Sequence, residues 1–158
     1  MIDKPSTIKQ KIMLKLAQDK NMRNYIGDVQ IEYPEDLIGK SIFPYLKVDG
    51  TVQESKVCIG ISANFPNINE KNNRFKNATI TILILCENGF LNTNNGYCRT
   101  DLISERICEL LNWNDIFGFR LNLISDKESP LDERFYTREL VFKTVTNNNT
   151  LNGSIINK

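Results

Sequence analysis

The fold is decided by one apolar stretch near the middle of the chain, ATITILILCEN at residues 78–88. Alternate side chains of an extended strand point to opposite faces, so Ile80, Ile82 and Ile84 share one face. The other face carries, in order, Thr79, Thr81, Leu83 and Leu85. This pattern predicts a central strand at Ala78–Cys86 that is half covered at its start and buried on both faces later.

Two helices are expected, one before this strand in the sequence and one after it. Ile8, Ile12 and Leu16 recur at helical spacing after the possible capping box of Thr7 and Gln10, and this helix is expected to run as far as a stop at Gly27. The second helix is expected to begin at an N-cap at Thr100, with apolar positions at 103, 107, 110 and 111.

Four further strands are expected. Those at 41–49 and 56–64 precede the central strand, and those at 120–124 and 135–145 follow the second helix. Pro44 makes the first of these an edge or a bulged strand, and Asp49-Gly50 favours a hairpin turn after it. Residues 65–77 and 125–133 are expected to be polar connections. The order helix, three strands, helix, two strands predicts an α+β domain over residues 1–146, with two main helices on a small, largely antiparallel sheet of four to five strands.

Composition sets the broad class of protein. The 158 residues carry a net charge of +1, with 41% apolar and 25% charged residues, which is ordinary for one globular domain. The small net charge disfavours general attraction to nucleic acid or lipid. No apolar run approaches the ~18 residues of a membrane span, and the polar N-terminus has no signal-peptide region, so a cytoplasmic origin without a membrane partner is expected.

The residues needed for most catalysis are missing. The chain has no histidine, no phosphate-binding loop and no Cys-x-x-Cys pair. The four cysteines are interpreted as small buried residues. Acidic pairs at 35–36, 126/128 and 132–133 lie in expected turns, where such groups are usually solvated. We therefore expect no catalytic residue, no cofactor and no metal, although Glu139 and Lys143, on one face of the last strand, leave a metal-dependent nuclease as a remote alternative.

Several residues are candidate contacts between subunits. Phe90 and Leu91 are apolar residues within a polar loop, and they either fold onto the core or meet a partner. Four charged residues lie near the ends of elements, where they serve either as local ion pairs and caps or as contacts between subunits, namely Arg99, Asp101, Arg134 and Arg138. The polar tail at 147–158 is expected to be a flexible arm that docks Ile155 and Ile156 on a neighbour.

The stretches GYCRTDLISERICELL (96–111) and SDKESPLDERFYTRELVFKTV (125–145), in this order of elements, resemble tailed-bacteriophage neck proteins of the tail-terminator type. The resemblance implies a non-enzymatic virion protein that forms a ring, commonly sixfold, at the head–tail junction or at the end of the tail tube. Its partners would be further copies of itself and neighbouring neck, connector or tail-tube proteins. DNA would only pass through the ring lumen.

A second hypothesis is a small phage-encoded binding protein, such as an inhibitor of a host protein. It predicts a monomer or dimer that captures a host protein, whereas the ring hypothesis predicts a larger assembly of one chain.

Overall fold

The computed structural model describes residues 5–27, 30–46, 56–65, 75–114 and 120–147, with backbone alone for 75–76 and 145–147. Residues 148–158 of the expected arm at 147–158, including Ile155 and Ile156, lie outside the described residues, and so does the Asp49-Gly50 turn. Among the described helices none is long and apolar enough to cross a membrane.

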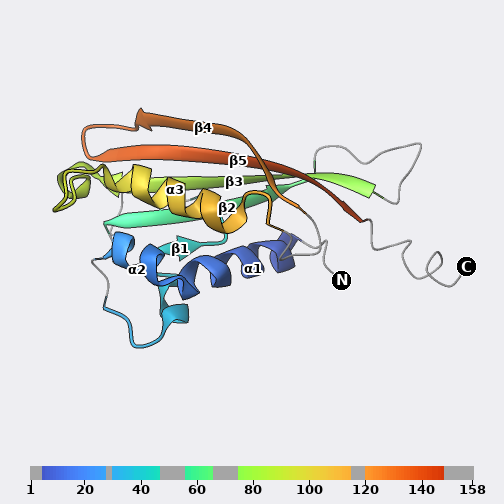
Figure 1. Cartoon of the computed structure of the whole chain (residues 1–158), viewed down its shortest axis with the longest axis horizontal. Helices are drawn as coiled ribbons and strands as arrows, with labels where there is room; N and C mark the ends of the chain where they lie inside the picture. The colour runs from blue at the N-terminus through green and yellow to red at the C-terminus, as the bar shows by residue number, and fades with distance from the viewer. Residues whose placement is uncertain (1–4, 28–29, 47–55, 66–74, 115–119, 148–158) are drawn as a thin grey trace, which may run out of the picture.

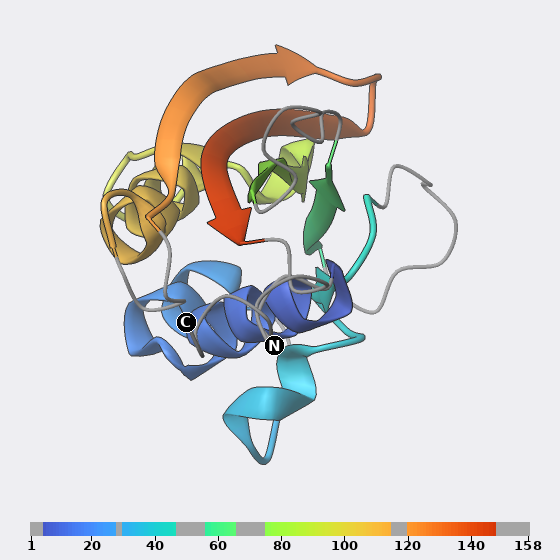
Figure 2. The ribbon, with the colours of Figure 1, turned by 90° about the vertical axis from the view of Figure 1, so that its right-hand side faces the viewer.

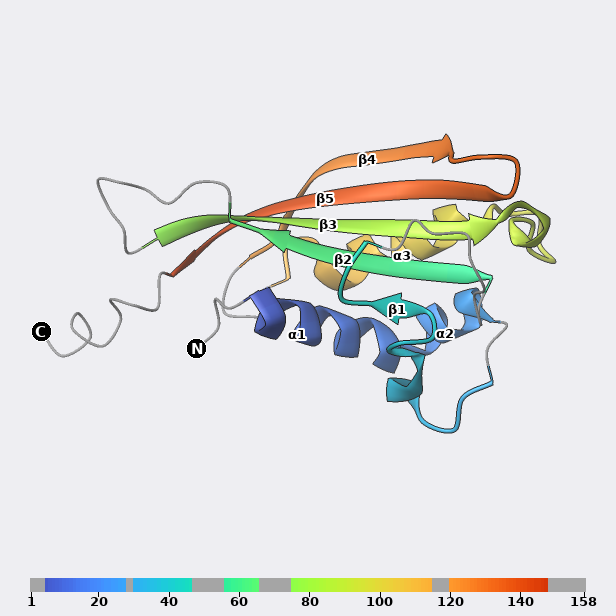
Figure 3. The same ribbon diagram turned by 180° about the vertical axis from the view of Figure 1, so that it is seen from behind.

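A five-stranded sheet forms the centre of the molecule, in the order β1-β2-β3-β5-β4 (Figure 3). Its strands are β1 (Ile42–Phe43), β2 (Val57–Asn64), β3 (Phe75–Glu87), β4 (Asn122–Pro130) and β5 (Phe135–Asn147). All neighbouring pairs are antiparallel except β1 and β2, which run parallel. The predicted α+β class and the largely antiparallel sheet are confirmed.

The helices all cover one face of this sheet, which curves over them (Figures 1 and 2). They are α1 (Pro5–Gln18), α2 (Lys20–Ile26) and α3 (Arg99–Leu111), with short 3-10 turns η1 (Pro34–Leu37) and η2 (Asn88–Phe90). α2 follows α1 along the long axis of the molecule, both under the sheet, and α3 lies beside them, nearer to β4 and β5 (Figures 1 and 2).

The main core fills the space between the helices and the sheet. Ile80, Ile82 and Ile84 are fully buried there, as their alternation predicts, and Leu140 and Phe142 of β5 join them. A second, smaller cluster of buried side chains brings together Phe43, Cys58, Leu85 and Phe135. The register places Leu85 on the face of β3 opposite the isoleucines, so the later part of this strand is buried on both sides.

The first helical stretch is two helices rather than the single one expected. Asp19 ends α1 and caps α2, since its Oδ2 accepts a hydrogen bond from the Met22 amide at 2.8 Å. The same carboxylate binds Arg106 of α3, with Nη2–Oδ1 at 2.6 Å and Nε–Oδ2 at 2.9 Å. Gly27 ends α2 in the left-handed conformation (φ 69°), as predicted.

The prediction of a charged loop at 125–133 is wrong, because β4 continues to Pro130. A register shift between Leu123 and Ser125 marks a β-bulge, after which β4 pairs with β5 as far as Tyr136. The strand is an edge strand with largely exposed side chains, so it does not need apolar alternation.

Other boundaries differ from the expectation as well. β1 stops before Pro44 and runs parallel to β2, so no hairpin joins these strands. β3 begins at Phe75 and β5 continues to Asn147, where an arm was expected to begin. α1 begins at Pro5, a favoured first helical residue, and α3 begins one residue after Cys98 rather than at a Thr100 cap.

α3 is followed by a strained residue. Trp113 has φ 60°, a left-handed conformation that is unfavourable for a bulky side chain. Its amide donates a hydrogen bond to the Leu121 carbonyl at 2.8 Å, which ties the end of α3 to the start of β4. The side chain remains 63% exposed, so the strain is not offset by burial of the ring.

The Asp19–Arg106 pair gives a pH-dependent prediction. The hydrogen bond from Arg106 lowers the pKa of Asp19, so this pair stabilises the fold above the ordinary carboxyl pKa and stops doing so as the pH falls through the lowered value. Asp19→Asn keeps an N-cap but removes the charge. We expect it to lower the free energy of unfolding by about 1–2 kcal/mol at neutral pH.

Denaturant unfolding of both proteins across the acid range checks this prediction, and the difference should shrink toward zero in strong acid. Glu109→Gln, which removes only the exposed partner of Arg106, serves as the control. A difference that is the same at every pH would contradict the argument.

Trp113 gives a second prediction. Trp113→Gly relieves the left-handed strain, whereas Trp113→Val places a β-branched residue there. Thermal unfolding should show the valine variant to be less stable than the glycine variant by about 1–2 kcal/mol. Equal stability of the two variants would mean that the backbone at 113 is not constrained.

Candidate interaction surface at the loop end

One end of the molecule holds three of the candidate contact residues, Phe90, Leu91 and Arg134, and adjoins the start of α3, which carries two more. It consists of the loop 88–98 after β3, the turn 131–134 between β4 and β5, and the C-terminal end of α2, and it is called the loop end below (Figure 1). The Asn88 amide donates to the Arg134 carbonyl at 2.8 Å, and the Asn88 Nδ2 donates to the Glu133 carbonyl at 2.7 Å. These bonds join the loop to the turn.

Arg99, the first residue of α3, holds the loop against α2. Its Nε donates to the Phe90 carbonyl at 2.8 Å, and its Nη1 donates to the Tyr25 carbonyl at 2.6 Å. The guanidinium also lies 3.7 Å from the centre of the Phe90 ring, a cation–π contact. The side chain therefore acts within the subunit as a clamp.

Gly27 allows this close approach of α2. A Cβ atom there would lie 3.0 Å from the Asn24 carbonyl oxygen and 3.6 Å from the Arg99 Nη1, at a backbone angle that side chains rarely adopt. The residue that stops α2 thus also makes room for the Arg99 clamp.

Phe90 and Leu91 turn inward, as one of the two expectations had it. Both are partly buried and pack against the main core. The exposed apolar side chains at this end are Tyr97 (61%) and Leu131 (44%), which the sequence reasoning missed. Tyr97 follows the left-handed Gly96 in a turn where the Thr93 Oγ1 accepts a bond from its amide. A lone aromatic residue after an Asn-Gly turn was the available signal.

Arg138 joins α3 to the two last strands. Its Nε and Nη2 bind the Asp126 carboxylate at 2.7 and 3.1 Å, and its Nη1 lies 2.6 Å from Asp101 Oδ1 and 3.4 Å from Glu128 Oε2. These carboxylates raise the pKa of Arg138 further. Asp101 and Arg138, both candidate contacts between subunits, are thus engaged with each other within one subunit.

Arg134 remains the most accessible of the candidate arginines. Its side chain is 57% exposed, with Nη2 at 3.3 Å from Glu87 Oε1 and the guanidinium 4.9 Å from the centre of the Phe135 ring. Of the eight candidate residues, the structure places five at the loop end or at the adjoining start of α3, and Arg138 on β5 in contact with Asp101 of α3. The other two, Ile155 and Ile156, lie outside the described residues.

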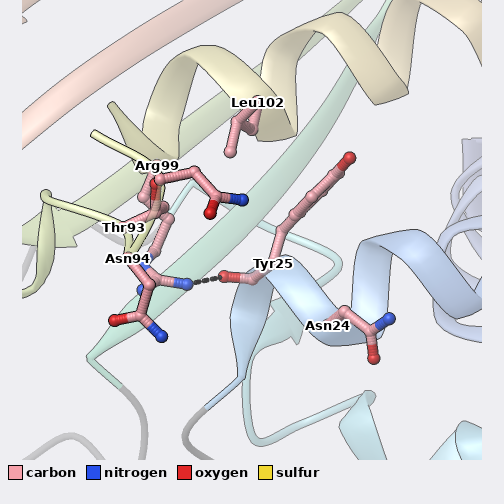
Figure 4. Close-up of a pocket in the computed structure, with 7 residues that line it drawn as sticks. Asn24, Tyr25, Thr93, Asn94, Arg99 and Leu102 are labelled. Atoms are coloured by element: carbon pink, nitrogen blue, oxygen red, sulfur yellow. Dashed lines mark hydrogen bonds between the residues drawn. The ribbon is translucent and has the colours of Figure 1, made fainter. Parts of the chain in front are cut away.

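A small depression lies between α2, the loop and α3 (Figure 4). Its volume is about 240 Å³, below the usual range of small-molecule sites. The lining is mostly polar and comprises Asn24, Tyr25, Thr93, Asn94, Asn95, Arg99 and Leu102. Arg99 already uses two of its nitrogens on backbone carbonyls, so the depression is a consequence of the clamp.

The acidic residues considered for catalysis do not converge. Asp126 and Glu128 pair opposite Leu140 and Arg138, on the helix-covered face, whereas Glu139 alternates with these residues and therefore lies on the other face, opposite Lys127. Within the described ranges, no group of three or more acidic or cysteine side chains is arranged to hold a metal ion.

The Arg138 network gives a testable prediction. Arg138→Ala leaves the carboxylates of Asp101, Asp126 and Glu128 without their shared cation. Because Arg138 is only 20% exposed, we expect a loss of roughly 1–2 kcal/mol in the free energy of unfolding. Arg134→Ala, at the more exposed pair, should lose about 0.5 kcal/mol or less in the same denaturant titration. A reversed order would refute the argument.

Comparison with known proteins places the chain in a family. The YomW family model matches residues 10–144, which include α2, α3 and all the described strands apart from the last three residues of β5. No curated protein matches the chain. Because the family match covers far more than half of the sequence, the chain belongs to the YomW family, a phage-derived protein family.

Proposed function

We propose that this protein is a non-enzymatic structural component of a phage particle, which forms a ring at the neck or at the end of the tail tube. The observation that carries the proposal is the phage-derived family match over 10–144. The resemblance of 96–111 and 125–145 to tail-terminator proteins is the reason to propose the neck or the tail end rather than another part of the particle. The location would be the virion, after synthesis in the host cytoplasm.

The loop end supports a role in contact with another protein. Tyr97 and Leu131 are large, exposed side chains on segments that are fixed by Arg99 and Asn88. Exposed aromatic residues on a well-held frame are typical of protein interfaces. In this proposal Phe90, Leu91, Arg99, Asp101 and Arg138 shape the surface from within, and Arg134 is a direct contact.

The long axis of the molecule suggests which neighbour the loop end meets. The loop end lies at one extreme of that axis (Figure 1). A contact there would join the ring to the next component of the neck or tube, while contacts between copies would use the sides. A ring, which the resemblance to tail-terminator proteins implies to be commonly sixfold, would leave a lumen for DNA. Ile155 and Ile156 would add contacts to a neighbouring copy.

Negative-stain microscopy with native mass measurement tests the proposal. The purified full chain should form closed rings, and these rings should bind isolated phage tail tubes or connectors. A chain that stays monomeric at all concentrations and binds neither would overturn the proposal. If such a monomer bound one host protein in a one-to-one complex, the second hypothesis, an inhibitor of a host protein, would replace the ring proposal.

The loop end gives its own prediction. The double variant Tyr97→Ala and Leu131→Ala should fold, since both side chains are exposed, and should still form rings. Its rings should bind tubes or connectors about tenfold more weakly, because two apolar contacts are lost. Tyr45→Ala, equally exposed but near the edge strand β1, is the matched control. Unchanged binding of the double variant in a sedimentation assay would exclude the loop end as the surface that binds tubes or connectors.

A further inference from the structure

The two edges of the sheet are poorly suited to pairing with another copy. At one edge β1 has only two residues, ends before Pro44 and pairs with just Ile59 and Gly60 of β2. At the other edge β4 carries a bulge, the charges of Asp126, Lys127 and Glu128, and Pro130. Short edge strands, bulges, charges and proline are the features by which proteins prevent strand addition. Contacts between copies are therefore better sought on the helices.

The outer face of α1 is one candidate. Its buried residues define one side of the helix, and Lys11, Leu14 and Lys15 lie away from that side and are partly exposed. The helix contains no acidic residue. It therefore offers a stripe of positive charge with a leucine in the middle.

The outer face of α3 has the opposite charge. Glu105 and Glu109 are both exposed, and they follow Asp101 at intervals of four residues. Asp126 of β4, which Arg138 binds, lies close by. Burial is the main cause that raises the pKa of the half-buried Cys108; Asp126 and the two glutamates add to this effect, and Arg138 opposes it. Arg106 is shared between Glu109 and Asp19, so the face keeps an excess of negative charge.

We propose that the outer face of α1 in one copy docks on the outer face of α3 in a second copy. Lys11 and Lys15 would meet Glu105 and Glu109. Each pair is four residues apart and spans about 6 Å along its helix, so the two stripes match in spacing. Complementary charge selects this partner and fixes the register of the contact.

The contact joins two different faces of the chain, and such contacts repeat head to tail and can close into a ring. α1 lies under the sheet and α3 beside it (Figure 2), and the two faces point away from the sheet in different directions. They adjoin along one border, where Lys15 and Leu110 line the same small depression. The inference rests on the proposed ring and names the surfaces that build it.

Two charge-reversed variants test the contact. Variant one carries Lys11→Glu and Lys15→Glu, and variant two carries Glu105→Lys and Glu109→Lys. Each variant alone should need about tenfold or more higher concentration to assemble, because every contact then opposes like charges. An equal mixture should assemble again into rings with alternating variants. Native mass measurement should find only even numbers of subunits in the mixture.

The matched control carries Lys20→Glu and Lys40→Glu, which change the net charge equally but lie off the outer face of α1. It should assemble as the natural chain does. Circular dichroism confirms that each variant folds. Trp113, the only tryptophan, lies one turn beyond Glu109 and is 63% exposed, so its emission should shift to the blue when the natural chain assembles.

The outcomes separate this inference from the proposed function. Rings that form unchanged from both reversed variants would overturn the α1–α3 contact and leave the ring function standing. A natural chain that never assembles would overturn both. Failure of the mixture to assemble, when each variant is folded and defective alone, would also reject the pairing of these two faces.

Discussion

The structure depends on the packing of one column of isoleucines on β3. Ile80, Ile82 and Ile84 are fully buried, and burial of each such side chain is worth about 1.5–3 kcal/mol. A shift of one residue in pairing would turn this column to the opposite face. The register of β3 with both β2 and β5 is therefore fixed by the same residues that attract the helices.

The sequence shows this centre well and its periphery poorly. Apolar residues mark β2, β3 and β5 because each strand places buried apolar side chains on the face toward the helices. β4 lacks that signal, because its SDKESP segment is polar and its pairing comes from the distant β5. The break at Asp19 is hidden for a similar reason. The apolar period continues through it, and the capping bond from the Met22 amide together with the contact with Arg106 shows that the residue ends one helix and begins another.

The candidate contact residues could likewise be predicted only in part. Their position near element ends could be predicted, but their partners could not. Arg138 looked available for a neighbouring subunit because Asp126 and Glu128 were expected in a loop, and it is held by them once 125–130 is a strand. Arg99 donates a hydrogen bond to the carbonyl of Tyr25, which lies 74 positions earlier in the chain, and no local sequence pattern indicates this contact. Exposure of Tyr97 and Leu131 likewise follows from how two separate loops meet.

The Arg99 clamp has a consequence for the thermodynamics of assembly. A loop that becomes ordered only on binding loses conformational entropy at that moment, and this loss weakens the complex. Here the loop 88–98 is already tied to α2 and to the turn 131–134 before any neighbour arrives. Binding at this end would therefore proceed with little reorganisation, and a variant that loosened the clamp would lower affinity even with every contacting side chain unchanged.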